Sequence, residues 1–199
     1  MVPLTKDPHY EVRYVAAEAL GDFRKTRAVV SALVDALFDK DEVVRLNAAL
    51  SLGKLRAREA FVHLVAVLTS DDDPLVRSYA AMAIGDIGDK SMIRVLRLVD
   101  KGERNATTRM GIQKALYDLG ERSRLREFLR GLDSPGYRDR CACANLVVEM
   151  VEQSNVAVVS RRLRRRLAKE RTVAVRSSIE AALASIKSRF GRRRHGSKD

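Results

Sequence analysis

The sequence contains few residues of the kinds that carry out metal or nucleophilic chemistry. Its three histidines, His9, His63 and His195, lie far apart, and no pair has the spacing of metal ligands. Cys141 and Cys143 are two residues apart, which on a helix points their side chains about 200° from each other, so they cannot bind one metal together. We therefore expect no metal site, no bound cofactor and no catalytic residues.

The acidic run 71–73 is the next candidate, because carboxylates can bind cations. A cation site needs oxygen ligands that converge from several directions. Here Asp73 precedes Pro74, a pair typical of a helix start, in which the aspartate caps the first turn and the proline needs no hydrogen-bond partner. Helix capping is the better interpretation of this run, and the chain does not read as an enzyme.

Arginine is the most abundant charged residue of this chain. The sequence holds 38 Lys and Arg against 26 Asp and Glu, a net charge of +12. Residues 1–100 are close to neutral, whereas residues 160–199 alone hold 14 basic and 3 acidic side chains. This density has two interpretations. One is a solvated helix face with a basic tail that keeps the protein soluble. The other, which we favour, is a docking surface for a polyanion (nucleic acid, an acidic protein segment or an anionic membrane), because guanidinium groups pair with carboxylates and phosphates.

A repeat with a fixed period must position these side chains. Arg13, Arg45, Arg77 and Arg109 stand 32 residues apart, each inside a similar phrase: VRYVAAEALG (12–21), VRLNAALSLG (44–53), VRSYAAMAIG (76–85) and TRMGIQKALY (108–117). Two more distant copies are YRDRCACANL (137–146) and VRSSIEAALA (175–184). Periods of about 20–50 residues are typical of solenoids, in which each unit buries its apolar face against the next.

Each unit reads as two helices. The phrase forms the first helix, whose alanines let neighbouring helices approach closely, and Gly21, Gly53 and Gly85 are predicted to end it in the left-handed conformation. The second helices are apolar segments with helical spacing: 28–38, 60–68, 92–99 and 124–132. No apolar run approaches the roughly 18 residues that span a bilayer.

The sequence therefore predicts an all-α protein, a right-handed α-α superhelix of about five helical-hairpin repeats closed by a C-terminal capping helix near residues 172–190. We expect one solenoid domain over residues 1–190 and a disordered basic tail over residues 191–199. Tyr117 and Leu146 replace the glycine in the fourth and fifth copies, so a change of curvature is expected near residues 102–122.

The phrase D-x-x-V-R-x-x-A-A-x-A-L-G followed by a helix resembles the HEAT repeat, most of all the bacterial phycobilisome-lyase HEAT-like type, over roughly residues 7–190. The resemblance implies that second helices line the concave face. It also implies structural roles for the phrase arginines, which would pair with aspartates of successive repeats in a ladder: Arg13, Arg45, Arg77, Arg109, Arg138 and Arg176. Cys141 aligns with the alanines at 16, 48 and 80, so we expect it to be buried; for Cys143 we favour a structural role over an exposed, reactive thiol.

These observations favour a non-enzymatic scaffold or adaptor that holds an acidic protein partner on its concave face. The arginines expected to touch the partner lie on second helices: Arg94, Arg97, Arg126, Arg130, Arg161, Arg162, Arg165 and Arg166. The alternative is nucleic-acid binding without sequence preference, which the absence of Trp and the few aromatics disfavour. A third hypothesis, a bilin-lyase-like enzyme or chaperone, rests on the resemblance alone. Free cysteines and a start without an apolar signal core predict a cytoplasmic protein.

Overall fold

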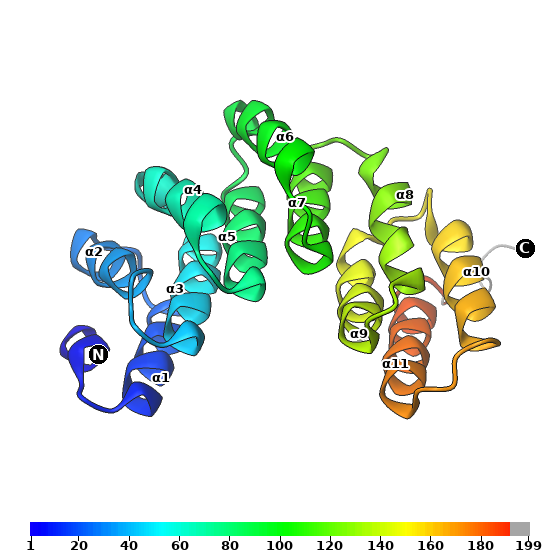
Figure 1. Ribbon diagram of the computed structural model, residues 1–199, viewed down its shortest axis with the longest axis horizontal. Helices are drawn as coiled ribbons and strands as arrows, with labels where there is room; N and C mark the ends of the chain where they lie inside the picture. Colours follow the sequence, from blue (N-terminus) through cyan, green and yellow to red (C-terminus); the bar gives the residue numbers. More distant parts are fainter. Residues whose placement is uncertain (192–199) are drawn as a thin grey trace, which may run out of the picture. The chain divides into compact units, whose positions relative to one another are not determined.

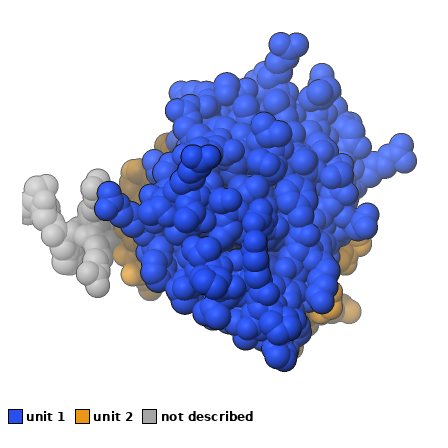
Figure 2. All heavy atoms as spheres, turned by 90° about the vertical axis from the view of Figure 1, so that its left-hand side faces the viewer, with its two compact units in different colours: residues 1–122 blue, residues 123–199 orange. Residues whose placement is uncertain are grey.

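The computed structural model describes residues 1–191, and over these residues it is helical throughout, without strands (Figure 1). The chain divides into two compact units, unit 1 over residues 1–122 and unit 2 from residue 123 onward (Figure 2). The prediction of an all-α solenoid is confirmed, while a single domain over residues 1–190 stays a prediction. The predicted basic tail lies outside the described residues from residue 192 onward.

Unit 1 alternates long first helices with shorter second helices (Figure 1). Its elements are η1 (Val2–Lys6), α1 (Tyr10–Leu20), α2 (Arg27–Ala36), α3 (Glu42–Lys54), η2 (Arg58–Ala60), α4 (Phe61–Ser70), α5 (Pro74–Ile87), η3 (Lys90–Met92), α6 (Ile93–Gly102) and α7 (Ala106–Asp118), where η marks a 3-10 helix. None of the helices described here combines the length and the apolar character that crossing a membrane requires.

Short polar side chains fix where the first helices begin. Asp41, Asp73 and Asn105 each accept a hydrogen bond from the backbone N–H two residues further on. Such caps satisfy amide groups that have no partner inside the helix. The acidic run 71–73 therefore contains the cap of α5, as the sequence predicts.

The first helices of unit 1 form one closely packed row. Helix α1 packs on α3, α3 on α5 and α5 on α7, while α2, α4 and α6 each pack on the following first helix and make little contact with one another. Alanines at the same place in successive repeats fill the row, among them Ala48 and Ala80, both fully buried. Leucines and valines from both rows complete the core, including Leu33, Leu64 and Leu96.

The repeated glycines belong to this close packing and not to left-handed caps, so that prediction is wrong. Gly21 has φ −64°, and Gly53 and Gly85 lie inside α3 and α5. A Cβ added at Gly85 would stand 2.7 Å from the Cα of Ala115, closer than atoms pack. The left-handed residues of the described chain come three positions later in the second to fourth repeats, at Arg56 with φ +49°, Gly88 with φ +81° and Gly120 with φ +110°.

Small residues in one row determine which side of unit 1 is concave. A stack of helices bends towards the row in which the backbones approach most closely, because that row is shorter. In unit 1 this is the row of α1, α3, α5 and α7, and α2, α4 and α6 lie on the outer side of the bend (Figure 1). The expectation that second helices line the concave face is therefore wrong for unit 1.

Unit 2 repeats the two-row arrangement with shorter and more broken helices. Its elements are α8 (Arg124–Phe128), η4 (Leu129–Asp133), α9 (Tyr137–Leu146), η5 (Val147–Met150), α10 (Val156–Leu167) and α11 (Val173–Phe190). Helix α9 packs on α11, while α10 packs on α11 and on η4. Phe128, Leu163 and Ile179 are buried between them. Helix α11 is the terminal helix expected near residues 172–190.

Candidate functional site

A ladder of arginines joins successive repeats and accounts for three of the six arginines assigned to it. Arg13 donates from Nε and Nη2 to the carboxylate of Asp39, at 2.7 and 2.8 Å, and Arg45 binds Asp71 in the same way. The third guanidinium nitrogen of Arg13, Nη1, donates to the backbone carbonyl oxygens of residues 7 and 8. Arg77 follows the same pattern, with Glu103 at 3.3 Å. The guanidinium groups of Arg13, Arg45 and Arg77 are therefore bound to other residues of unit 1.

Arg109 lies outside this ladder. Its side chain is 53% exposed, and its Nε is 3.8 Å from a carboxylate oxygen of Asp100. In the other repeats the acid stands six residues before the next ladder arginine, and here that position is Ser134, which carries no carboxylate. Arg176 keeps the contacts to backbone carbonyls, those of Leu167 and Glu170, at 3.1 Å each.

In the fifth repeat the ladder residue is Arg140, so the assignment of Arg138 is wrong. Arg140 donates to the carboxylate of Glu170 at 2.9 Å and to the carbonyl oxygens of Ser134 and Pro135. Arg138 is exposed and contacts the neighbouring Tyr137. Both positions hold arginine in the sequence, and the similarity of the flanking residues favoured the wrong one by two residues.

The same two-residue shift moves the buried alanine position from Cys141 to Cys143, so the placing of Cys141 there is wrong, whereas the structural role favoured for Cys143 agrees with its burial. Cys143, three residues after Arg140, takes the place of the buried alanines, and its Sγ lies 3.4 Å from the carbonyl oxygen of Phe128. Burial raises the pKa of the Cys143 thiol to about 12, so the thiol stays protonated and unreactive at neutral pH. Cys141 is the partly exposed cysteine.

Glu170 is the most heavily bonded carboxylate of unit 2. Its burial alone would raise its pKa, but the backbone N–H of Thr172 and the guanidinium groups of Arg166 and Arg140 outweigh burial and hold the pKa well below its usual range. The nitrogens of Arg166 lie 2.6 and 2.9 Å from one carboxylate oxygen. This cluster anchors the C-terminal end of α10.

The five arginines of α10 fall into two groups, those that form ion pairs within unit 2 and those that are exposed. Val159 and Leu163 are buried against the rest of unit 2. Arg162 pairs with Asp133 in the neighbouring η4, and Arg166 pairs with Glu170. Two of the four α10 arginines expected to touch a partner are therefore engaged within the fold.

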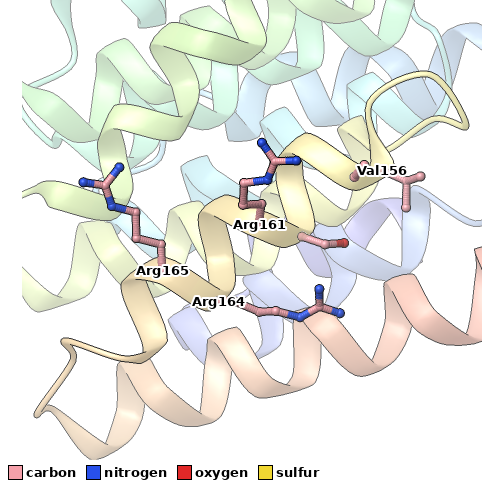
Figure 3. Close-up of a pocket in the computed structure, with 6 residues that line it drawn as sticks. Val156, Arg161, Arg164 and Arg165 are labelled. Carbon is pink, nitrogen blue, oxygen red and sulfur yellow. The ribbon is translucent and has the colours of Figure 1, made fainter.

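The remaining arginines of α10, Arg161, Arg164 and Arg165, are exposed, and we call them the arginine face. They line a hollow along the helix together with Val156, Ala157 and Ser160. Figure 3 shows Arg161 and Arg165 extending from one side of α10 and Arg164 from its flank. Within residues 1–191 none of the three pairs with an acidic side chain. Arg164 was missed, although a spacing of three residues from Arg161 places the two on neighbouring turns.

The other four predicted contact residues lie on three different elements. Arg94 and Arg97 belong to α6 of unit 1, and Arg97 has its guanidinium 2.6 Å from the carboxylate of Glu121. Arg126 in α8 and Arg130 in η4 belong to unit 2 and are exposed. Among all the predicted contact residues, α6 holds two and α10 holds four, so these residues are most concentrated on α10. In that part of the chain no three His, Cys, Asp or Glu side chains converge so as to hold a metal.

Comparison with protein families agrees with this architecture. The family described as HEAT repeats matches residues 2–78 and again residues 61–146. The chain belongs to the HEAT repeat family. Helix α10, which carries the arginine face, follows the matched residues in the sequence. A comparison with curated protein sequences returned no match.

Several solved structures are similar to this HEAT-repeat protein at low sequence identity. Human deoxyhypusine hydroxylase in complex with glycerol has 16% identity and a TM-score of 0.50, covering 94% of each chain. The complex of CpcE and CpcF of phycocyanin lyase from a Nostoc species has 18% identity and a TM-score of 0.46, covering 93% of this chain and 92% of that one. An engineered protein has 18% identity and a TM-score of 0.44, covering 94% and 97%. The hydroxylase match, with its TM-score of 0.50, shows a similar fold and no more.

Proposed function

We propose that this HEAT-repeat protein is a non-enzymatic scaffold that binds an acidic segment of a protein partner through the arginine face of α10. The observation that supports this role is the division of the α10 arginines. Arg162 and Arg166 hold the helix in place through Asp133 and Glu170, and Arg161, Arg164 and Arg165 point three guanidinium groups away from those partners.

The chemistry of this surface suits carboxylates. Each guanidinium presents several N–H donors in a planar fork that matches a carboxylate. Helix α10 carries no acidic side chain that could compete for them. Exposed Val158 and the hollow residues Val156 and Ala157 add apolar surface, so an acidic segment that also carries an apolar side chain fits best. We expect Arg126 and Arg130 to add to the positive field of unit 2, which steers an acidic partner.

A protein segment is favoured over nucleic acid by the composition of the hollow. Proteins that grip single strands stack bases on aromatic side chains between the basic residues, and the described lining of this hollow holds no aromatic ring. The unpaired cysteines, Cys141 and Cys143, suit the reducing cytoplasm in which we place this role.

A fluorescein-labelled peptide of about ten residues rich in glutamate is a direct probe, since its carboxylates present the proposed chemistry. We expect the triple variant R161E/R164E/R165E to bind it at least about tenfold more weakly than the natural chain at physiological salt, a loss of about 1.4 kcal/mol. The matched control is R24E/K25E/R27E, which makes the same change of charge at exposed residues of unit 1. Equal weakening in both variants would show that net charge alone attracts the peptide and would refute the site.

A second titration with labelled duplex DNA over a salt series separates the two kinds of polyanion. Phosphate binding releases counterions, so its affinity falls steeply with salt. If the chain binds DNA more tightly than the acidic peptide at physiological salt, and R161E/R164E/R165E loses that DNA binding, then the ligand of the arginine face is nucleic acid and the proposal of an acidic protein partner is wrong.

A further inference from the structure

The inner row of unit 1 presents a surface of different chemistry from the arginine face. When α1, α3 and α5 are aligned on their ladder arginines, the positions two residues before, two after and five after that arginine lie on the helix face opposite the arginine. They hold Glu11, Val15 and Glu18 on α1, Val43, Asn47 and Leu50 on α3, and Leu75, Tyr79 and Met82 on α5. Among them Met82 is buried and Tyr79 packs in part against the core. Because consecutive first helices pack side by side, these positions are neighbours on the concave side of unit 1 (Figure 1).

Most of these side chains are apolar, and several are open to solvent. Val15, Val43 and Leu75 are 49%, 37% and 44% exposed, and they come from three adjacent helices. Leu50 and Tyr79 lie beside them, half-buried. We call these five residues the inner patch. A contiguous apolar surface on a folded protein marks a binding site more often than single exposed side chains do.

The charge at the edge of the inner patch is negative. Glu11 and Glu18 stand on either side of Val15, one helical turn away in each direction, and both are exposed. Within the described residues neither forms an ion pair. Arg13 is the one basic residue of α1, and its side chain forms an ion pair with Asp39, so it does not neutralise Glu11 or Glu18. A turn further along, Asp22 is paired with Lys54 at 3.4 Å, so it adds less to the field.

We propose that the inner patch binds an amphipathic helix of a protein partner, with its apolar stripe on Val15, Val43 and Leu75 and with lysine or arginine beside Glu11 and Glu18. An α-helix is about 10 Å across, and packed helices lie about 8–10 Å apart, so one added helix can contact two neighbouring helices of the row. Burial of the partner's apolar stripe against the inner patch would supply affinity, and the carboxylates of Glu11 and Glu18 would favour a partner with basic side chains beside that stripe. This inference goes beyond the proposed function, which concerns α10 and an acidic segment.

Two synthetic helical peptides test the proposal on the full chain. Both carry leucine at helical spacing on one face, and the other positions hold lysine in one peptide and glutamate in the other. We expect the Leu/Lys peptide to bind at least about tenfold more tightly than the Leu/Glu peptide, and E11K/E18K to reverse or abolish that preference. Equal binding of both peptides would overturn the electrostatic part of the proposal.

Substitution of the apolar residues locates the site. V43S/L75S should weaken the Leu/Lys peptide at least about tenfold. The matched control is V62S/L98S, which removes two exposed apolar side chains, 78% and 72% exposed, from the outer helices α4 and α6. All four positions are open to solvent, so the thermal midpoints should stay close to that of the natural chain. Equal weakening by the two pairs, or none by V43S/L75S, would refute the inner patch.

A second copy of the chain is the competing occupant, because α10 carries exposed arginines beside an exposed Val158. Sedimentation velocity of the chain alone decides this. If the chain associates with itself, and this association is lost both in E11K/E18K and in R161E/R164E/R165E, then the occupant of the inner patch is a second copy of the chain and the proposal of a separate partner is wrong. The R161E/R164E/R165E variant must still bind the Leu/Lys peptide, so failure of the arginine face and failure of the inner patch are separate results.

Discussion

Replacement of Gly85 by alanine tests why the first helices lie so close together. Gly85 is inside α5, and a Cβ built there would stand 2.7 Å from the Cα and 3.0 Å from the Cβ of Ala115 in α7. Carbon atoms pack at about 3.5–4.0 Å, so α5 and α7 would have to separate by about 0.8 Å. The obstructing atom is backbone, which cannot move out of the way by changing a rotamer.

The size of the effect follows from two opposing contributions. Overpacking of a filled site costs about 1–3 kcal/mol, and a backbone obstruction belongs at the upper end of that range. Alanine is the better helix former by about 1 kcal/mol in a helix interior. We therefore expect G85A to lower the free energy of unfolding by about 2 kcal/mol, which corresponds to about 4–8 °C in melting temperature for a chain of this length.

Urea denaturation followed by circular dichroism measures this loss, with G102A as the control. Gly102 ends α6, and an added Cβ there meets nothing within 4 Å, so G102A should be neutral or slightly stabilising. The double variant G85A/A115G removes the contact with the Ala115 Cβ but keeps the 2.7 Å contact with its Cα, so it should remain less stable than the natural chain. A G85A protein as stable as the natural chain would refute the close approach of α5 and α7.

Three further predictions concern the ladder and the thiols. R140M should lose about 2–4 kcal/mol of stability, because Arg140 is buried with Glu170, whereas R138M should change stability by less than about 0.5 kcal/mol; equal losses would refute the register of the fifth repeat. The pKa of Glu170 is lower in the folded than in the unfolded state, so its contribution is present above the ordinary value of 4.5 and is lost as the pH falls below it. The stability difference between the natural chain and E170Q should therefore shrink during acid titration, and a constant difference would contradict the ion pair. Ellman's reagent should titrate one thiol, Cys141, in the native chain and a second, Cys143, after denaturation; two fast thiols in the native chain would contradict the burial of Cys143.

The regular part of the fold could be predicted from the sequence because it repeats. A period of 32 residues with arginine and alanine at fixed places specifies a solenoid without knowledge of any distance. The start of α5 could also be predicted, since Asp73 and Pro74 form a local signal that depends on neighbouring residues only. The C-terminal helix followed from the last copy of the phrase.

The errors arose where the sequence leaves two local interpretations that tertiary packing decides. Glycine after a run of alanines suits both a left-handed cap and a close helix contact, and the contact of Gly85 with Ala115 is visible in three dimensions only. Arg138 and Arg140 both suit the ladder, and the acid that selects Arg140 is Glu170, 30 residues away. Likewise, nothing local distinguishes Arg162, which pairs with Asp133, from the exposed Arg161 beside it.

Amide hydrogen exchange of the full chain with and without the glutamate-rich peptide tests the docking role of α10 most directly. The arginine face predicts that the peptide slows exchange over residues 156–167 and leaves α1 to α7 unchanged. Slower exchange confined to unit 1, with residues 156–167 unaffected, would contradict it.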